Sequence, residues 1–244
     1  MHRLFHADSS QELSRYHVNH FDTCFADPPD NIGLEYDGFD DNMADYAGWT
    51  EDALIGLLDV AKYVWWSFNP KHTVMMGGIC HKHRRRWTVR PCVQMFTFGT
   101  NRQSDLVPAH RPLWRISQQS PGGDYPLFPD AIRIESWRQK NGDKRASPKG
   151  KVPDDVFDFP RVVGNSKQKR KWHKTQLHEG LVERCLKLTT PPGGRVLDPF
   201  AGTATVLRVA QRCGFDSDSY EISKTYYEHI KEENHDYLTL DSAL

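Results

Sequence analysis

The sequence predicts one large α/β domain that carries an irregular inserted segment. Two short segments, residues 21–26 and 195–197, finish in apolar side chains and are each followed by an Asp-Pro pair, Asp27-Pro28 in the first and Asp198-Pro199 in the second. Proline can neither continue a helix nor donate to the ladder of a central strand, so each segment is typical of a strand that stops at its carboxylate. A third observation is the alternation of strand, turn, helix and strand across residues 195–221. We therefore expect the two strand ends to form one shared site.

Composition indicates the compartment of the protein but does not identify its binding partner. The 244 residues include 32 basic and 32 acidic side chains, so the net charge does not indicate a polyanionic partner. The charges are nevertheless segregated, because residues 31–61 hold eight acids and no Lys or Arg, whereas residues 161–174 hold six Lys or Arg and no acid. Five scattered cysteines predict a reducing compartment without a disulfide framework. No apolar run approaches the roughly 20 residues of a membrane span, so we expect a soluble cytoplasmic protein without a membrane partner.

The first elements follow from short apolar runs and the polar residues that end them. Residues 4–7 are predicted to form a strand that ends at Asp8, another acid at a strand end, and a brief helix follows. After the strand 21–26, glycines indicate a loop that contains Tyr36 and Phe39. We expect this loop to be mobile.

The middle of the chain is predicted to contain one helix and three strands. Residues 50–62 place four apolar side chains at helical spacing, which indicates an amphipathic helix with a solvated acidic face. Residues 63–68 are rich in aromatic and β-branched side chains and are expected to form a buried strand. Two further strands are predicted at 93–98 and 113–116.

The short cluster at residues 80–87 has two interpretations. Cys80, His81 and His83 would supply three ligands for a metal ion, but adjacent ligands rarely close a tetrahedron, and no second pair has the spacing of a zinc finger. We therefore predict no metal site and favour a basic surface turn that contacts phosphates. The residues concerned are Arg84, Arg85 and Arg86.

Residues 117–171 form the inserted segment. Frequent Pro and Gly residues break every long element there, and Trp137 and basic side chains are interleaved among them. An ordinary surface loop is the alternative. Loops beyond about 12–15 residues inside a compact domain are usually functional or disordered, so we favour a functional insert.

The C-terminal third has the clearest pattern. Residues 176–188 predict a helix with one apolar face, and a strand, a turn of small residues at 201–205 and a second helix follow. The next strand ends at Glu221, 23 positions after Asp198, close to the roughly 20-residue spacing of a ribose-binding acid. The turn has one glycine where pyrophosphate-binding turns have three. The pattern therefore favours a nucleoside that has a positive centre and no phosphate, such as S-adenosylmethionine.

Both halves of this pattern resemble one enzyme family. Asp27-Pro28-Pro29-Asp30 resembles the Asp-Pro-Pro-Tyr catalytic motif of amino-group DNA methyltransferases, and residues 173–176, 197–205 and Glu221 resemble that family's cofactor motifs. The order, with the catalytic half first and the cofactor half last, resembles the permuted β class of these enzymes. The resemblance covers most of the chain except about residues 75–172.

This resemblance implies a fold, a division of the chain and a cofactor. The fold would be a mixed, mostly parallel seven-stranded sheet flanked by helices, the Rossmann-like methyltransferase fold, with its site at the C-terminal ends of the strands. The chain would comprise a catalytic half (1–116), a target-recognition insert (117–171), a cofactor-binding half (172–235) and a C-terminal tail (236–244). S-adenosylmethionine would be bound by Asp8, Asp27, Thr175, Gln176, Asp198, Phe200, Gly202, Thr203, Ala204, Thr205 and Glu221.

The implied reaction is methyl transfer to the exocyclic amino group of adenine in double-stranded DNA, after the base has left the stack. The Asp27 carboxylate and the Pro28 carbonyl would accept hydrogen bonds from that amino group and localise its lone pair towards the methyl group. Pro29 would keep both acceptors rigid, and Asp30 completes the catalytic motif. Cytosine as the target base, RNA as the substrate, and a catalytically silent DNA-binding module are the alternatives.

Two residues depart from the family pattern. Asp30 stands where the family has an aromatic ring, and stacking of that kind contributes roughly 1–3 kcal/mol per base. Tyr36, Phe39 and Trp49 are the candidates to replace that ring. Ala204 stands where glycine is common.

The basic residues of the chain are expected to hold DNA. The basic run at Lys169, Arg170 and Lys171 is expected to contact phosphates together with the insert. Whether the protein acts as a monomer or a homodimer is left open by the sequence.

Overall fold

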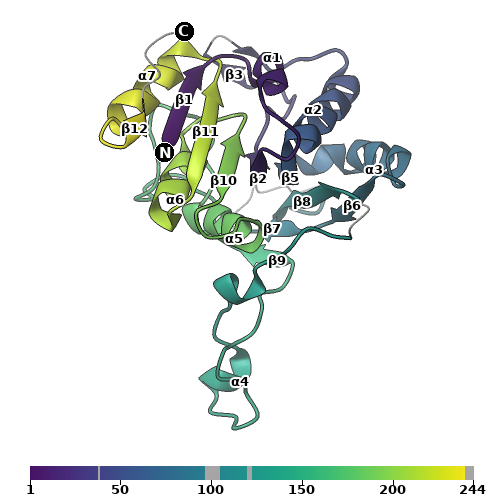
Figure 1. Cartoon of the computed structure of the whole chain (residues 1–244), viewed down its shortest axis with the longest axis vertical. Coiled ribbons are helices and arrows are strands. Elements are labelled where there is room, and N and C mark those ends of the chain that lie inside the picture. Colours follow the sequence, from purple (N-terminus) through teal and green to yellow (C-terminus); the bar gives the residue numbers. More distant parts are fainter. Residues whose placement is uncertain (38, 97–104, 120–122, 240–244) are drawn as a thin grey trace.

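The protein is built on one mixed β-sheet with helices on both faces (Figure 1). The computed structural model describes residues 1–37, 39–96, 105–119 and 123–239. The strands are β1 (His2–His6), β2 (Phe21–Ala26), β3 (Glu35–Tyr36), β4 (Phe39–Asp40), β5 (Ala61–Ser67), β6 (Trp87–Arg90), β7 (Val93–Met95), β8 (His110–Gln118), β9 (Val156–Asp158), β10 (Arg195–Asp198), β11 (Asp216–Glu221) and β12 (Leu238–Thr239). The helices are α1 (Ser9–Glu12), α2 (Tyr46–Val60), α3 (Thr73–Lys82), α4 (Trp137–Lys140), α5 (Glu179–Thr189), α6 (Thr205–Cys213) and α7 (Lys224–Glu233).

The strand order is β12-β1-β11-β10-β2-β5-β8-β7-β9, and β6 also pairs with β8. Strands β12 to β5 in this order are all parallel, whereas β8 is antiparallel to β5. The expected mixed, mostly parallel sheet is confirmed. It has ten strands rather than seven, because short strands extend both edges and β6 and β7 share one long neighbour, β8.

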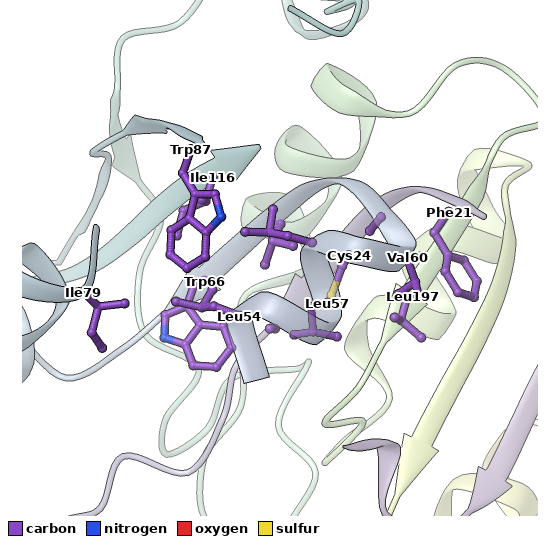
Figure 2. Packing of buried hydrophobic residues seen from close by; sticks show 14 of the residues in the cluster. Phe21, Cys24, Leu54, Leu57, Val60, Trp66, Ile79, Trp87, Ile116 and Leu197 are labelled. Atoms are coloured by element: carbon purple, nitrogen blue, oxygen red, sulfur yellow. The ribbon is translucent and has the colours of Figure 1, made fainter. Parts of the chain in front are cut away.

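Two apolar layers hold the helices against the sheet. On one face, Cys24 and Trp66 pack with Leu54 and Leu57 of α2 and with residues of α3, as the close view of this cluster shows (Figure 2). On the other face, Phe25 and the α5 and α6 side chains form a second cluster. Successive residues of β2 therefore serve opposite faces, which explains why its last three residues, 24–26, are all apolar.

The central pairing brings together the two strand ends singled out in the sequence. Leu197 of β10 is the partner of Cys24 of β2, and the two strands run parallel. Asp198 directly follows Leu197, and Asp27 lies three positions after Cys24, so the two carboxylates are at the same edge of the sheet. Asp27 and Asp198 are far apart in the sequence, but adjacent parallel strands have their carboxyl ends on the same side of the sheet, so the two side chains lie near each other.

Several elements differ from their expected form. The helix predicted from residue 50 begins at Tyr46, because the Asp45 side chain accepts a hydrogen bond from the backbone of Gly48 and caps it. Residues 73–82 form α3, for which no helix was expected, and the basic turn expected at residues 80–87 follows this helix at residues 83–86. The strand predicted at 93–98 is β7, and its last two residues lie outside the described part of the chain.

The inserted segment contains a projecting arm, defined here as residues 129–155. Figure 1 shows it extending away from the sheet with α4 near its tip. Ile134 and Lys151 form an antiparallel bridge at which the two sides of the arm meet. Trp137 is 75% exposed in the arm. The insert is not wholly irregular, because β9 follows the arm and pairs with β7 in the sheet.

Candidate active site

A pocket of about 970 Å³ lies at the carboxyl ends of the central strands. Its lining includes residues 27–30 from one half of the chain and Asp198, Gly202 and Glu221 from the other. The volume is at the upper end of the range for small-molecule sites, which suits a cavity that takes more than one group. The structure thus brings the two sequence motifs into one cavity.

The Asp-Pro-Pro-Asp turn is held rigidly by its neighbours. The hydroxyl of Tyr46 donates to the carbonyl of Pro29 at 2.8 Å. The buried carboxylate of Asp41 accepts hydrogen bonds from the backbone N–H groups of the three residues Asn31, Ile32 and Leu34. Among the residues that the structure describes, no group donates to the carbonyl oxygen of Pro28. Pro28 is one of the residues that line the pocket, and its carbonyl oxygen has free acceptor capacity among the described residues.

Asp30, which stands where an aromatic ring would stack on a base, forms an ion pair with Arg111. Arg111 of β8 donates to both oxygens of Asp30, at 2.8 and 3.0 Å, and to Oδ1 of Asp27, at 2.9 Å. Arg111 was not singled out in the sequence. It was missed because the start of an antiparallel strand gives no motif, although antiparallel pairing places it beside the carboxyl ends of β2 and β5.

Asp198 and Glu221 form an acidic corner at the opposite side of the pocket. Burial raises the pKa of Asp198 well above its usual value, despite a hydrogen bond from the backbone N–H of Phe200. Its Oδ2 is buried and has no partner in the described part of the chain. Burial also raises the pKa of Glu221, whose two oxygens accept hydrogen bonds from the backbone of Gly202 and Ser223, both at 2.8 Å. A buried carboxylate oxygen without a partner favours a cationic group in the cavity.

In the turn at residues 201–205, the backbone comes close to a neighbouring side chain, that of His173. Gly202 has φ 53°, and a Cβ built there would lie 3.4 Å from Nε2 of His173. The hydroxyls of Thr203 and Thr205 lie 3.0 Å apart and both residues line the pocket. Ala204, which was expected among the cofactor-binding residues, is not among those that line the pocket. It adopts a left-handed conformation, with φ 56°, and its side chain is fully buried in the core.

The remaining expected cofactor residues also reach the pocket. Asp8 lines it and caps α1 by accepting hydrogen bonds from the backbone and hydroxyl of Ser10. Phe200, Thr175 and Gln176 line it as well. The Gln176 side chain bonds to the backbone of Gln168 and Arg170, so it holds the preceding loop in place.

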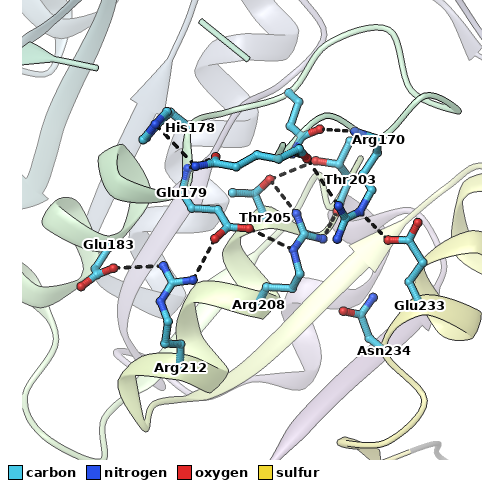
Figure 3. A network of polar contacts seen from close by, with 12 residues as sticks. Arg170, His178, Glu179, Glu183, Thr203, Thr205, Arg208, Arg212, Glu233 and Asn234 are labelled. Atoms are coloured by element: carbon cyan, nitrogen blue, oxygen red, sulfur yellow. Dashed lines mark hydrogen bonds and ion pairs between the residues drawn. The ribbon is translucent and has the colours of Figure 1, made fainter. Parts of the chain in front are cut away.

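Behind this wall lies a network of ion pairs, drawn in Figure 3. Arg208 of α6 donates to the Thr203 carbonyl at 2.5 Å and to Glu179 at 3.3 Å, and Arg212 bonds Glu179 and Glu183. The network ties α5 to the turn that leads into α6. The threonine turn is thus supported by charged groups that do not line the cavity themselves.

The three candidate aromatic residues all line the pocket. Trp49 stacks on Tyr46 and lies 5.9 Å from the Phe200 ring, measured between centroids. Tyr36 pairs with Phe39 in the β3–β4 hairpin. The loop expected to be mobile is therefore a hairpin, and its Asp37 accepts a hydrogen bond from the Ser223 hydroxyl at 2.8 Å.

The first group of basic residues expected to hold DNA, Arg84, Arg85 and Arg86, lies away from the pocket. Arg84, Arg85 and Arg86 are exposed in the turn before Trp87, which pairs with Gln118 at the end of β8. That end of β8 adjoins the start of β5, so the turn lies at the edge of the sheet opposite the pocket.

Two residues of the 169–171 run form intramolecular bonds. Lys169 donates to the carbonyls of His173 and Lys174, and Arg170 pairs with Glu233, while Lys171 is exposed. These bonds fix the loop and occupy the charges that were expected to face phosphates. Arg161, which lines the pocket and lies 5.4 Å from the Phe96 ring centroid, was missed.

Other structural expectations concern metals and membranes. Cys80 is buried in α3 and His83 bonds Glu51 at 2.6 Å. The described residues contain no group of three or more His, Cys, Asp or Glu suited to a metal ion. In the same part of the chain, no helix has the length and apolar character needed to cross a bilayer.

The mixed sheet and the pocket at the carboxyl ends of its strands have the arrangement expected of the Rossmann-like methyltransferase fold. Residues 21–232 match the family model described as DNA methylase, and the chain belongs to this family of N6 and N4 methyltransferases. The expected family, enzyme class and fold are therefore confirmed. YhdJ, a DNA adenine methyltransferase of Escherichia coli strain K12, is 29% identical over 244 residues, which cover 91% of this chain and 79% of YhdJ.

Solved structures share the fold at low sequence identity. TTHA0409 of Thermus thermophilus, solved as a complex with S-adenosyl-L-methionine, matches with a TM-score of 0.65 at 16% identity, covering 100% of both chains. The PvuII DNA methyltransferase, described as cytosine-N4-specific, gives a TM-score of 0.65 at 13% identity and covers 93% of this chain and 83% of its own.

Proposed function

We propose that this DNA methyltransferase moves a methyl group from S-adenosylmethionine to the exocyclic amino group of adenine in double-stranded DNA. The observation that carries the proposal is the continuity of the pocket, which joins the Asp27-Pro28-Pro29 turn to Asp198 and Glu221. One end offers fixed acceptors for an amino group. The other end offers acids for a cationic nucleoside.

The acidic corner and the turn fit S-adenosylmethionine. When bound, this cofactor supplies a methyl group made electrophilic by its sulfonium. Asp198, whose Oδ2 has no partner in the described structure, would face a positive charge of the cofactor, and Glu221 retains acceptor capacity for ribose hydroxyls. Gly202 allows the backbone to approach the ligand closely.

The catalytic turn would bind the amino group through two acceptors. Oδ2 of Asp27 and the carbonyl of Pro28 receive no hydrogen bond from any described residue, whereas Oδ1 of Asp27 is bonded to Arg111. Two acceptors for the two N–H groups of the amine would direct its lone pair towards the methyl group. The new N–C bond would form as the bond from that methyl group to the cofactor sulfur breaks, and Oδ2 of Asp27 would accept the proton that the nitrogen then gives up. Positioning and fixed electrostatics would thus account for catalysis.

The target base has to leave the helix to reach a pocket at this depth. Unstacking costs a few kcal/mol, and aromatic side chains offset part of that cost by stacking on the base. Trp49 and Tyr36 provide rings on the pocket wall in place of the aromatic that Asp30 replaces. Base flipping is therefore part of the proposal.

DNA would approach from the side of the insert. Arg161 and Lys174 are exposed and line the pocket mouth with positive charge. The arm, residues 129–155, holds seven Lys or Arg against five acids, so its net charge is positive. Charges of this sign on an exposed projection match the phosphates of a duplex.

Nucleoside analysis tests the function directly. Unmethylated duplex DNA is incubated with the protein and S-adenosylmethionine, digested to nucleosides and analysed by mass spectrometry, with Asp27→Ala as the control. N6-methyladenine above the control is expected. N4-methylcytosine would change the base, and no methylated base with DNA of varied sequence or with RNA would leave a silent DNA-binding module. Sedimentation at working concentration separately distinguishes a monomer from a homodimer.

A further inference from the structure

Arg111 connects the two acids of the Asp-Pro-Pro-Asp turn. Besides its bonds to Asp27 and Asp30, its Nε donates to the hydroxyl of Ser67 at 2.7 Å. A guanidinium has five N–H groups, and four of them are used in these bonds. Three side chains, two from the turn after β2 and one from β5, therefore fix the plane of the guanidinium.

The charges of Asp27 and Asp30 are balanced by one cation, Arg111. The side chains of Asp27 and Asp30 are only 24% and 11% exposed, so water screens them incompletely. Burial by itself lowers the pKa of Arg111, but the charges of Asp27 and Asp30 outweigh it and raise that pKa above its usual value. Arg111 therefore stays charged at any working pH and relieves the repulsion between the two carboxylates.

We infer that Arg111 is a positioning residue for Asp27, and that Asp30 serves to hold Arg111. The inference rests on the proposed role of Asp27. By binding Oδ1, Arg111 leaves Oδ2 in one orientation, facing the amino group, before the base arrives. A bidentate fork pairs with Asp30 in a fixed geometry, which a single ammonium cannot reproduce. An ion-paired clamp has thus replaced the aromatic residue at position 30.

Steady-state kinetics separate positioning from binding. We expect Arg111→Ala to lower kcat by about 10²-fold, in line with the effect of a small misplacement of a catalytic group, with the KM for S-adenosylmethionine unchanged. Arg111→Lys should restore only part of that loss. Arg115 is the matched control, because it lies on the same strand and packs over the rings of Tyr63 and Trp65. Arg115→Ala should stay within about threefold of the wild type.

Chemical rescue of kcat by added guanidinium distinguishes a positioning role of Arg111 from a merely structural one, because a structural defect would not be restored by the added ion. Guanidinium chloride at tens of millimolar should raise the kcat of Arg111→Ala but not that of Arg115→Ala, and ammonium chloride at equal ionic strength should not. Asp30→Asn should lower kcat in the wild-type background. In the Arg111→Ala background it should have little further effect, because the two residues act as one unit.

The outcomes distinguish this inference from the proposed function. A wild-type protein without turnover would contradict both. If the wild type methylates DNA and Arg111→Ala keeps kcat within threefold, or shows no rescue, the positioning role is wrong. Should Arg111→Ala fail to fold, Asp30→Asn decides, since it preserves the side-chain volume: an unchanged kcat overturns the inference, and a lowered kcat with unchanged cofactor affinity supports it.

Discussion

Among single residues, Asp27 has the most direct prediction. Asp27→Asn keeps the shape of the side chain but places an amide where two acceptor oxygens were, so one N–H group of the target amine loses its partner. We expect kcat to fall by about 10²–10³-fold, as on removal of one preorganised electrostatic contact. Affinity for S-adenosylmethionine, measured by calorimetry, should change little. A variant with wild-type turnover would remove Asp27 from the mechanism.

Asp198 leads to a prediction about pH. Because burial raises its pKa, the folded protein without cofactor keeps a proton that the unfolded chain has released, between about pH 4 and the raised pKa. Stability therefore falls as pH rises through that window. Asp198→Asn should make this decline shallower, seen in melting temperatures between pH 5 and 8. Parallel curves for the two proteins would contradict the assignment.

The same substitution should weaken cofactor binding. A hydrogen bond to a charged group contributes about 1.5–3 kcal/mol, so the Kd for S-adenosylmethionine should rise by roughly tenfold or more. Isothermal calorimetry at pH 7.5 measures it. Asp22→Asn is a suitable control, because Asp22 pairs with Lys62 away from the lining of the pocket. Equal affinity in the wild type and the Asp198 variant would argue against a cationic ligand at this corner.

The sequence predicted the residues that stand in motifs and missed those that fold topology delivers. Asp27 and Asp198 each follow a short apolar stretch and precede a proline, and Glu221 has the spacing from Asp198 of a ribose-binding acid, so all three carry a signal in the local sequence. Arg111 has no such signal, because only the antiparallel pairing of β8 places it in the site. Ala204 shows the converse, since its position in a motif does not reveal that its side chain turns into the core.

At the scale of elements, Asp41 controls the catalytic turn. It is 1% exposed and satisfies three backbone donors of the loop that follows Pro29. Asp41→Ala should lower the free energy of unfolding by about 1–3 kcal/mol or more, because buried donors lose their partner. Urea denaturation measures it. The exposed neighbour Asp40 provides the control, and Asp40→Ala should remain within about 0.5 kcal/mol of the wild type.

The strands that the sequence predicted well are the ones bounded by clear turn signals. The strands β2, β5, β10 and β11 were expected close to their observed positions, because short buried runs between turn signals mark them. Helix α3 was missed, since Gly77 and Gly78 lower its helix propensity and its last residues are basic. The arm gave no periodicity, so only its length and composition indicated that it had a role.

For the molecule as a whole, the arm can be separated from the catalytic body. Replacing residues 135–150 by a short Gly-Ser turn, next to the Ile134–Lys151 bridge, should leave melting temperature and cofactor affinity unchanged. DNA affinity should fall by about tenfold or more, and its dependence on salt should become shallower, because phosphate contacts are lost. Fluorescence anisotropy at several salt concentrations measures both. An unchanged salt slope would mean that the arm does not contact DNA.

The position of β1 has a consequence for how the chain is made. Its partners in the sheet are β11 and β12, so nearly the whole chain has to be synthesised before either partner exists. At about 5–20 residues per second, this delay lasts on the order of 10–40 s. The two edges of β1 stay unpaired throughout, and unpaired edges invite association with other chains. Nascent chains of this protein should therefore depend on chaperones more than a protein whose first strands pair with each other.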